Sequence, residues 1–280
     1  MIKDYKINIL SRDEYGRPSG IVAVNKPADI TSHDIVNQLR KQLNTRKVGH
    51  AGALDVFAQG LMIYLIGKAT KLSDKIIHLD KEYITTIVFG IATNTQDTEG
   101  DITEIKTGYS ISGLGDIEQT LKEFEGKRKQ YVSVFSSVKV GGKKLRVLMR
   151  DNNYEKNINY DKDSNKQITF IPVDKESAQK PFSIKVPSKE ITLYSIELIE
   201  KGDTAVSDMD KLAKKLNTLP PTQTFPYIKV RIKSSKGTYI RQLAEDIGEK
   251  LNMPAMLLSL TRTKIGSITL EDCLPVGEIK

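Results

Sequence analysis

The clearest pattern of buried and exposed positions lies in the last third of the chain. From 228 to 233 apolar residues alternate with Lys and Arg, which predicts a strand with one buried face. Apolar residues then recur at spacings of three and four from 240 to 251, which predicts an amphipathic helix. Tyr239 and Arg241 fall in the first turn of this helix, next to the short connection 234–238. We therefore expect both side chains to reach a cleft.

A strand and a helix are also predicted near the beginning of the chain. Residues 20–27 form a short apolar run closed by proline. The helix that follows has Thr31 or Ser32 as its N-cap, and Asp34 suits the positive end of its dipole. Its apolar residues recur every four positions from 35 to 43, so one face of the helix should be buried.

The rest of the chain predicts shorter elements. Two polar stretches, at about 151–167 and 200–224, contain few apolar residues, and we expect exposed loops or insertions there. Leu212 and Leu216 mark a small helix inside the second stretch. The other expected elements are strands at 61–66 and 83–89, short helices at 69–77 and 114–125, a polar turn at 92–101, and a strand followed by a basic helix within 130–150.

Composition narrows the function only in part. The 280 residues include 43 Lys and Arg against 35 Asp and Glu, a formal net charge of +8. This excess suits a polyanionic partner such as nucleic acid, but an ordinary basic surface explains it equally well. The hydrophobic fraction of 39% is enough to form a real core.

Several features favour a cytoplasmic protein without membrane attachment. The most apolar run, 61–66, is far too short to cross a bilayer. Residues 1–19, which we treat as an N-terminal extension, lack the apolar core of a secretory signal. Cys273 is the only cysteine, so an internal disulfide and a cysteine-based zinc site are both excluded.

The densest candidate for chemistry is the glycine-rich segment around residue 55. Gly49, Gly52 and Gly60 surround His50 and Asp55. Glycines at this density let the backbone adopt conformations closed to other residues and approach a ligand closely. A carboxylate beside a histidine on such a loop suggests a site. From spacing alone, a glycine turn in which Asp55 caps the next element is about equally credible.

At this segment the sequence resembles a known family. Gly49–Asp55 is similar to the Gly-His-Thr-Gly-Ala-Leu-Asp signature of the TruB family, bacterial synthases that make pseudouridine in the TΨC loop of tRNA. The chain departs from the family pattern at Ala51, Val56, Gln59 and Asn94, none of which removes a group that the chemistry needs. Further matches follow in family order from about residue 20 to 272: Asn25-Lys26-Pro27 with Thr31-Ser32, Lys81-Glu82-Tyr83, Thr93–Gly100, Gln130–Leu145, Lys236–Arg241 and Leu260-Thr261-Arg262.

The resemblance implies an α/β (α+β) pseudouridine synthase fold. Residues 20–280 should form one catalytic domain with a central, mixed but mostly antiparallel sheet, flanking helices and variable polar insertions that grip RNA. The active cleft should cross the middle of the sheet. We expect no C-terminal RNA-binding (PUA) module of the kind that many members carry.

The implied activity is the isomerisation of uridine 55 in the tRNA TΨC stem-loop, by a monomer without an obligate protein partner, cofactor or metal. Asp55 would act as the nucleophile on a flipped-out uridine, and whether it attacks C1′ or C6 or starts a glycal route stays open. Burial in a site sealed from water would raise the pKa of that carboxyl, and Arg241 would keep it ionised. Without the resemblance, an arginine in a first helical turn is more often simply exposed.

Five further residues are carried over as contacts to the substrate. Tyr83 would stack on the flipped base, and Tyr239 would line the same pocket and orient the base. Leu260 would supply the opposite wall, and His50 would fill the space that extruded nucleotides leave. Lys26 would either contact phosphate or support the Asp55 loop. Each of these residues also has a plain structural interpretation, as a packed core side chain or a satisfied polar group.

A basic run is the candidate for RNA backbone contacts: Lys139, Lys143, Lys144, Arg146 and Arg150. Such a run is more often a solvated helix face. Two other functions stay open from the sequence. The chain could be an RNA-binding or tRNA-folding protein with secondary or lost catalysis, or a synthase that acts on a different RNA uridine.

Overall fold

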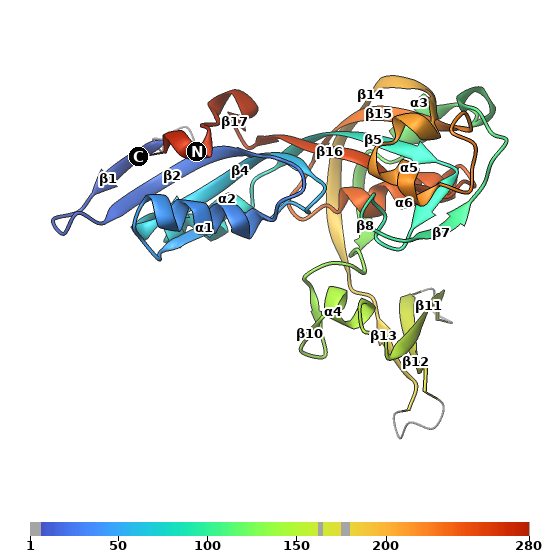
Figure 1. Ribbon diagram of the computed structural model, residues 1–280, viewed down its shortest axis with the longest axis horizontal. Helices are drawn as coiled ribbons and strands as arrows, with labels where there is room; N and C mark the ends of the chain where they lie inside the picture. Colours follow the sequence, from blue (N-terminus) through green and yellow to red (C-terminus); the bar gives the residue numbers. More distant parts are fainter. Residues whose placement is uncertain (1–6, 162–164, 175–179, 280) are drawn as a thin grey trace.

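The fold is built on one long, twisted sheet (Figure 1). The computed structural model describes residues 7–161, 165–174 and 180–279. The strands of the main sheet are β1 (Ile9–Arg12), β2 (Pro18–Lys26), β3 (Val48–His50), β4 (Gln59–Ile66), β5 (Lys81–Phe89), β8 (Gly126–Tyr131), β14 (Ser188–Ala205), β15 (Thr224–Ser234), β16 (Ala255–Ile265) and β17 (Ile268–Thr269).

The order of these strands is β1-β2-β4-β16-β5-β15-β14-β8, with β3 added to β4 and β17 to β16. Every pairing between these strands is antiparallel except that of β16 with β4, which is parallel. The expected mixed, mostly antiparallel sheet is therefore confirmed. Strand β1, from the N-terminal extension, pairs with β2 at the edge.

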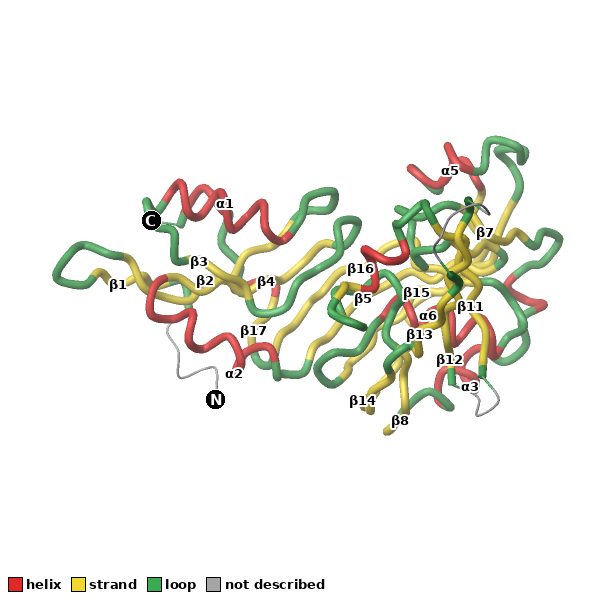
Figure 2. Tube along the Cα trace, turned by 90° about the horizontal axis from the view of Figure 1, so that it is seen from below, coloured by secondary structure: helices red, strands yellow, loops and turns green. Residues whose placement is uncertain are grey.

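Helices cover both faces of the sheet. The helices are α1 (Ser32–Gln42), α2 (Ser73–Ile77), α3 (Ile117–Lys122), α5 (Lys211–Lys215) and α6 (Ile240–Lys250), with 3-10 turns η1 (Gly67–Leu72), η2 (Ile111–Gly113), η3 (Val206–Asp208), η4 (Leu270–Asp272) and η5 (Val276–Glu278). Buried residues of α1, α3 and α6 share one core with the strands, whereas α2 and α5 pack in two smaller cores. Seen from below, α1 and α2 lie at one end of the sheet, and α3, α5 and α6 at the other (Figure 2). No helix in the described ranges has the length and apolar character needed to cross a membrane.

Local sequence chemistry accounts for the best-defined elements. Thr31 is the N-cap of α1, which confirms one of the two predicted caps, and it also forms a capping box with Asp34. Strand β15 buries Ile228, Val230 and Ile232, which confirms the predicted alternation. The helix predicted after it is α6.

Other predicted elements differ in extent. The helix expected at 69–77 is divided into η1 and α2, and the one expected at 114–125 is the shorter α3. The polar turn at 92–101 joins β6 (Ile91–Thr93) to β7 (Ile102–Ile105). Much of the first part of 200–224 extends β14, and the small helix expected around Leu212 is α5.

A separate lobe, formed by the described residues from 132 to 187, projects from the sheet where β8 ends and β14 begins (Figure 1). Its own apolar core includes Val134, Leu148 and Phe170. It contains β9 (Lys139–Val140), β10 (Lys143–Lys144), α4 (Leu145–Met149), β11 (Tyr154–Tyr160), β12 (Lys166–Pro172) and β13 (Phe182–Lys185).

The prediction of a loop at 151–167 is wrong for most of the described residues in this range, because β11 and β12 pair there as an antiparallel ladder. The buried apolar side chains of this ladder, Ile168 and Phe170, lie outside the polar stretch 151–167. Strand β11 is an edge strand and leaves most of its own side chains exposed. The polar composition of β11 therefore gave no sign of a strand, because the buried side chains of the ladder belong to its neighbour β12.

Candidate functional site

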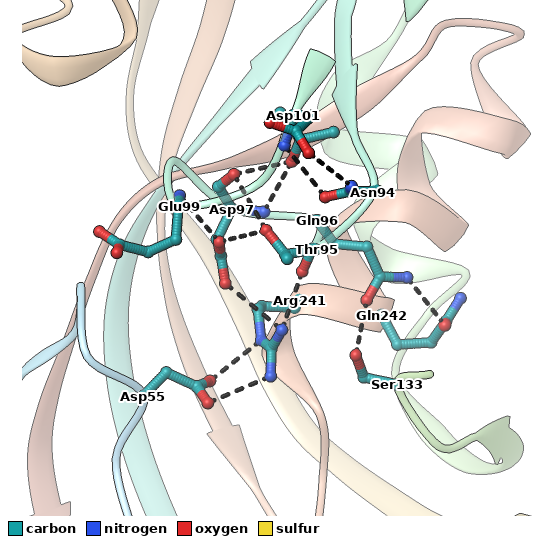
Figure 3. A network of polar contacts seen from close by, with 11 residues as sticks. Asp55, Asn94, Thr95, Gln96, Asp97, Glu99, Asp101, Ser133, Arg241 and Gln242 are labelled. Carbon is teal, nitrogen blue, oxygen red and sulfur yellow. Dashed lines mark hydrogen bonds and ion pairs between the residues drawn. The ribbon is translucent and has the colours of Figure 1, made fainter. Parts of the chain in front are cut away.

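Asp55 and Arg241 meet although 186 positions separate them in the sequence (Figure 3). Arg241 Nε lies 3.0 Å from Asp55 Oδ2, and Nη2 donates to Oδ1 at 3.1 Å. A two-bond contact of this kind fixes the orientation of the carboxylate as well as its position. The Arg241 side chain is 7% exposed and that of Asp55 is 45% exposed. The carboxylate is thus held by a buried guanidinium and remains accessible to a ligand.

The turn between β6 and β7 holds Arg241 from behind. Arg241 Nη1 donates to the carbonyl of Thr95 at 2.8 Å and lies 3.3 Å from Asp97 Oδ2. Asp97 also accepts hydrogen bonds from the Thr95 hydroxyl and the Glu99 amide. Burial raises the pKa of Asp97, and Arg241 opposes that rise. The burial that we expected at Asp55 therefore falls on Asp97, to which the sequence assigned no role beyond a motif match.

Two of the three glycines around Asp55 have backbone conformations that favour glycine over other residues. Gly52 and Gly60 have φ values of +87° and +114°, which side chains rarely tolerate. A Cβ on Gly60 would lie 2.4 Å from the carbonyl oxygen of Arg262, which is rigid backbone. Gly49 has no positive φ and nothing within 4 Å of an added Cβ. The glycine requirement is thus confirmed at two positions and absent at the third.

Arg262 supports this loop from within the protein and was not singled out from the sequence. Its Nε donates to the carbonyl of Leu61 at 2.7 Å, and Nη2 donates to that of Gly52 at 3.2 Å. The side chain is fully buried, and burial lowers its pKa. The nearby Tyr83 hydroxyl opposes this lowering of the pKa. One buried guanidinium therefore ties the Asp55 loop to strand β4.

Lys26 is buried beneath the same loop. Its Nζ donates to the carbonyls of Pro27 and Ile30, both at 2.8 Å, and to that of Val56 at 3.4 Å. Burial lowers the pKa of Lys26 to about 8, although nearby carboxylates including Asp55 oppose the shift. Of the two roles considered for Lys26, these contacts favour support of the loop over contact with phosphate.

Tyr83 and Leu260 lie on the neighbouring strands β5 and β16. Leu260 is opposite Thr85, two residues from Tyr83, so both side chains point to the same face of the sheet. They are 8% and 5% exposed and belong to the core that also contains residues of α1 and α6. The structure therefore places both as packed side chains in this core.

Tyr239 is the N-cap residue of α6 and is fixed by its backbone. The Gln130 side chain bonds both its amide and its carbonyl, at 2.9 and 3.0 Å. The ring lies 4.2 Å below the Lys189 ammonium, and burial raises the pKa of the hydroxyl. Tyr239 is thereby locked between the sheet and the entry to the lobe.

His50 is on β3 and packs edge-to-face on Tyr64, with ring centroids 6.4 Å apart. Burial lowers its pKa, and its Nδ1 has no hydrogen-bond partner. The structure thus packs His50 of β3 against Tyr64, without a contact that would mark it for proton transfer.

The structure does not bring the basic run to the Asp55–Arg241 pair. The five side chains are exposed on the β9–β10 hairpin and around α4, in the lobe: Lys139, Lys143, Lys144, Arg146 and Arg150.

A cavity of about 350 Å³ lies outside the lobe, and Leu260 and Phe57 are among the residues that line it. Lys211 of α5 lines it and pairs with both Asp29 and Glu99.

Comparison with known proteins identifies the family of this chain. Residues 40–190 match the model of the TruB family pseudouridylate synthase N-terminal domain. A tRNA pseudouridine synthase B of Protochlamydia amoebophila is 34% identical over 99% of this chain and 87% of its own length. A protein of the same name from Bacillus pumilus is 33% identical over 94% of this chain and 70% of its own.

Solved structures support the fold independently. An archaeal box H/ACA sRNP Nop10–Cbf5 complex matches with a TM-score of 0.51 at 19% identity. The match covers 92% of this chain and 52% of that one, so this chain spans about half the length of its structural neighbour. The family model, the curated relatives and the motif order all agree, and the chain belongs to the TruB family of pseudouridylate synthases.

Proposed function

We propose that this protein is a tRNA pseudouridine synthase that converts uridine 55 of the TΨC loop to pseudouridine. The observation that carries the proposal is the half-exposed Asp55 carboxylate held by the buried Arg241 guanidinium. The curated relatives that cover most of the chain bear the name tRNA pseudouridine synthase B. Uridine 55 in the TΨC stem-loop is the substrate that the family resemblance implies.

The reaction rearranges bonds without net oxidation. The N1–C1′ bond breaks, the detached base turns over, and a C5–C1′ bond forms, after which the C5 proton is lost and N1 is protonated. Asp55 acts as the nucleophile, at C1′ or at C6, or starts a glycal route by removing a sugar proton. Arg241 holds the carboxylate by two bonds and aims it at the nucleoside, while Asp97 and Thr95 keep Arg241 in place.

The remaining site residues would surround the extruded uridine. Tyr83 and Leu260 lie on adjacent strands under the cleft and would contact the two sides of the base. Tyr239, fixed by Gln130, would orient it. His50 would occupy space that the displaced nucleotides leave, and Lys26 would hold the loop through the Val56 carbonyl.

We further propose that residues 20–280 act as one catalytic unit, as a cytoplasmic monomer. A chain that only bound or refolded RNA would have no chemical need for a carboxylate held in this way. Burying Arg241 and Asp97 costs desolvation energy, and we attribute this cost to their role in orienting a reacting group.

Mapping pseudouridine in an unmodified tRNA transcript tests the function. The purified protein is incubated with the transcript, without added metal or nucleotide, and product should appear at uridine 55 alone. A transcript with cytidine at that position is the control and should stay unmodified. Product at another uridine would overturn the site specificity, and absence of product under conditions of measured binding would overturn the activity.

Replacing Arg241 by lysine should lower the single-turnover rate by roughly 100-fold with little change in tRNA affinity. Lysine keeps the charge but cannot bond both oxygens of Asp55 while also bonding the Thr95 carbonyl. Rapid-quench kinetics at saturating tRNA measure the rate. The matched control is Arg231→Lys, since Arg231 makes a single ion pair with Glu197 on the surface. Equal rates for the two variants would contradict the prediction.

Replacing Lys139 and Lys143 together by alanine should weaken tRNA binding and flatten its salt dependence. Each lost phosphate contact lowers the slope of log K against log salt by about one unit. The control is Lys214 and Lys250, cations of α5 and α6 outside the lobe, replaced in the same way. Filter binding at several salt concentrations measures the slope, and an unchanged slope would refute a role for the run in RNA binding.

A further inference from the structure

Gln96 lies at the centre of a buried polar network that joins three parts of the molecule (Figure 3). Its Oε1 accepts a hydrogen bond from Ser133 at the entry to the lobe, at 3.0 Å. Its Nε2 donates to Gln242 at 3.0 Å and to Glu245 at 2.7 Å, both on α6. The side chains of Gln96, Ser133 and Gln242 are buried, and the amide of Gln96 uses both its oxygen and its nitrogen.

Gln96 also has an uncommon backbone conformation between the two groups that hold Arg241. Its φ is +65°, a left-handed value that persists in a residue other than glycine only where the surroundings enforce it. The residue before it supplies the carbonyl of Thr95 and the residue after it supplies the carboxylate of Asp97. A shift of Gln96 would therefore move both rear contacts of the guanidinium.

Glu245 extends the network to the lobe. Its Oε2 accepts bonds from Gln96 and Gln242 and lies 3.3 Å from Nζ of Lys166 on β12. The Lys166 side chain is 8% exposed. Burial alone would lower the pKa of Lys166, but Glu245, together with Tyr160 and Glu249, outweighs it and the pKa is raised. Lys166 is thus a charged lobe residue buried against the helix that carries Arg241.

We propose that Gln96 is a positioning residue for Arg241, and that the Lys166–Glu245 ion pair makes its position depend on the docking of the lobe against α6. When the lobe is seated, Glu245 and Ser133 fix the Gln96 amide, and the Thr95–Asp97 turn holds the guanidinium against Asp55. This inference rests on the proposed function for its kinetic consequences, but the coupling itself can be measured without catalysis.

Hydrogen–deuterium exchange of the free protein tests the coupling. The amides of Asn94, Gln96 and Asp97 are hydrogen-bonded within the turn, so their exchange reports its opening. Lys166→Met, made in the lobe, should accelerate exchange across residues 93–99. The control is Lys185→Met, which removes the Lys185–Asp161 pair inside the lobe, 3.1 Å long, without touching α6. Equal exchange in the turn for these two variants would overturn the lobe coupling.

Single-turnover kinetics test the positioning role. Gln96→Gly removes the side chain and tolerates the positive φ, so it separates the hydrogen bonds from backbone strain. At saturating tRNA its rate should fall about tenfold, with its dissociation constant within about threefold of wild type. The loss from Lys166→Met should not add to the loss from Gln96→Gly, because both break one network. Additive losses, or a wild-type rate for Gln96→Gly, would overturn the inference. Absence of product from the wild type would instead count against the proposed function and leave exchange in the turn to decide the coupling.

Discussion

Asp55→Asn is expected to bind tRNA normally and to form pseudouridine at least about 10⁴-fold more slowly than the wild type. The amide has nearly the shape of the carboxylate, and its oxygen can still accept a hydrogen bond from Arg241. It has no negative charge, so it can neither attack the nucleoside nor remove a proton from it. Pseudouridine mapping after single turnover gives the rate, and filter binding gives the affinity.

The control for this variant is Asp80→Asn, which also removes one negative charge from the protein. Asp80 is exposed and accepts a hydrogen bond from Tyr194, which an amide oxygen can keep. Its activity should equal that of the wild type. Product from Asp55→Asn at a rate within about tenfold of the control would exclude Asp55 as the reacting group.

Gly60→Ala is expected to lower the free energy of unfolding by about 3 kcal/mol or more. Two costs add, since the residue has a φ of +114° and the new Cβ would lie 2.4 and 2.6 Å from the backbone oxygen and nitrogen of Arg262. Neither atom can rotate away as the end of a side chain can. Equilibrium unfolding in urea measures the difference.

Gly49→Ala is the matched control, in the same glycine-rich segment. It has open space around the added Cβ and no positive φ, so its stability should lie within about 0.5–1 kcal/mol of the wild type. Similar losses for the two variants would show that the close approach of β4 to β16 does not constrain residue 60.

Local patterns predicted the parts of the fold that depend on local physics. The alternation in β15 and the N-cap of α1 need only neighbouring residues, and both were found where expected. Strand β11 was missed because its stability depends on the apolar residues of β12 and on pairing across a ladder. A polar edge strand leaves little trace in its own sequence.

The same distinction between local and long-range interactions applies to the prediction of the site. Spacing alone left Asp55 and Arg241 open to plain structural readings, and it was the family resemblance that paired them. The structure confirms that the two side chains are in contact. Most of the support around them was not predicted, because Asp97 and Arg262 reach their partners through the packing of distant segments. Only for Lys26 was support of the loop one of the roles considered. Nothing in a single sequence reveals which charged side chain will be buried.

The position of β16 in the sheet has a consequence for biosynthesis. This late strand lies between β4 and β5, and it pairs with β4 through Thr261 and Arg262. A nascent chain that ends before Ala255 contains both Asp55 and Arg241. It lacks β16, the strand that joins β4 to β5 in the sheet. A nascent chain therefore cannot assemble this reaction centre until β16, which ends at Ile265, has been synthesised.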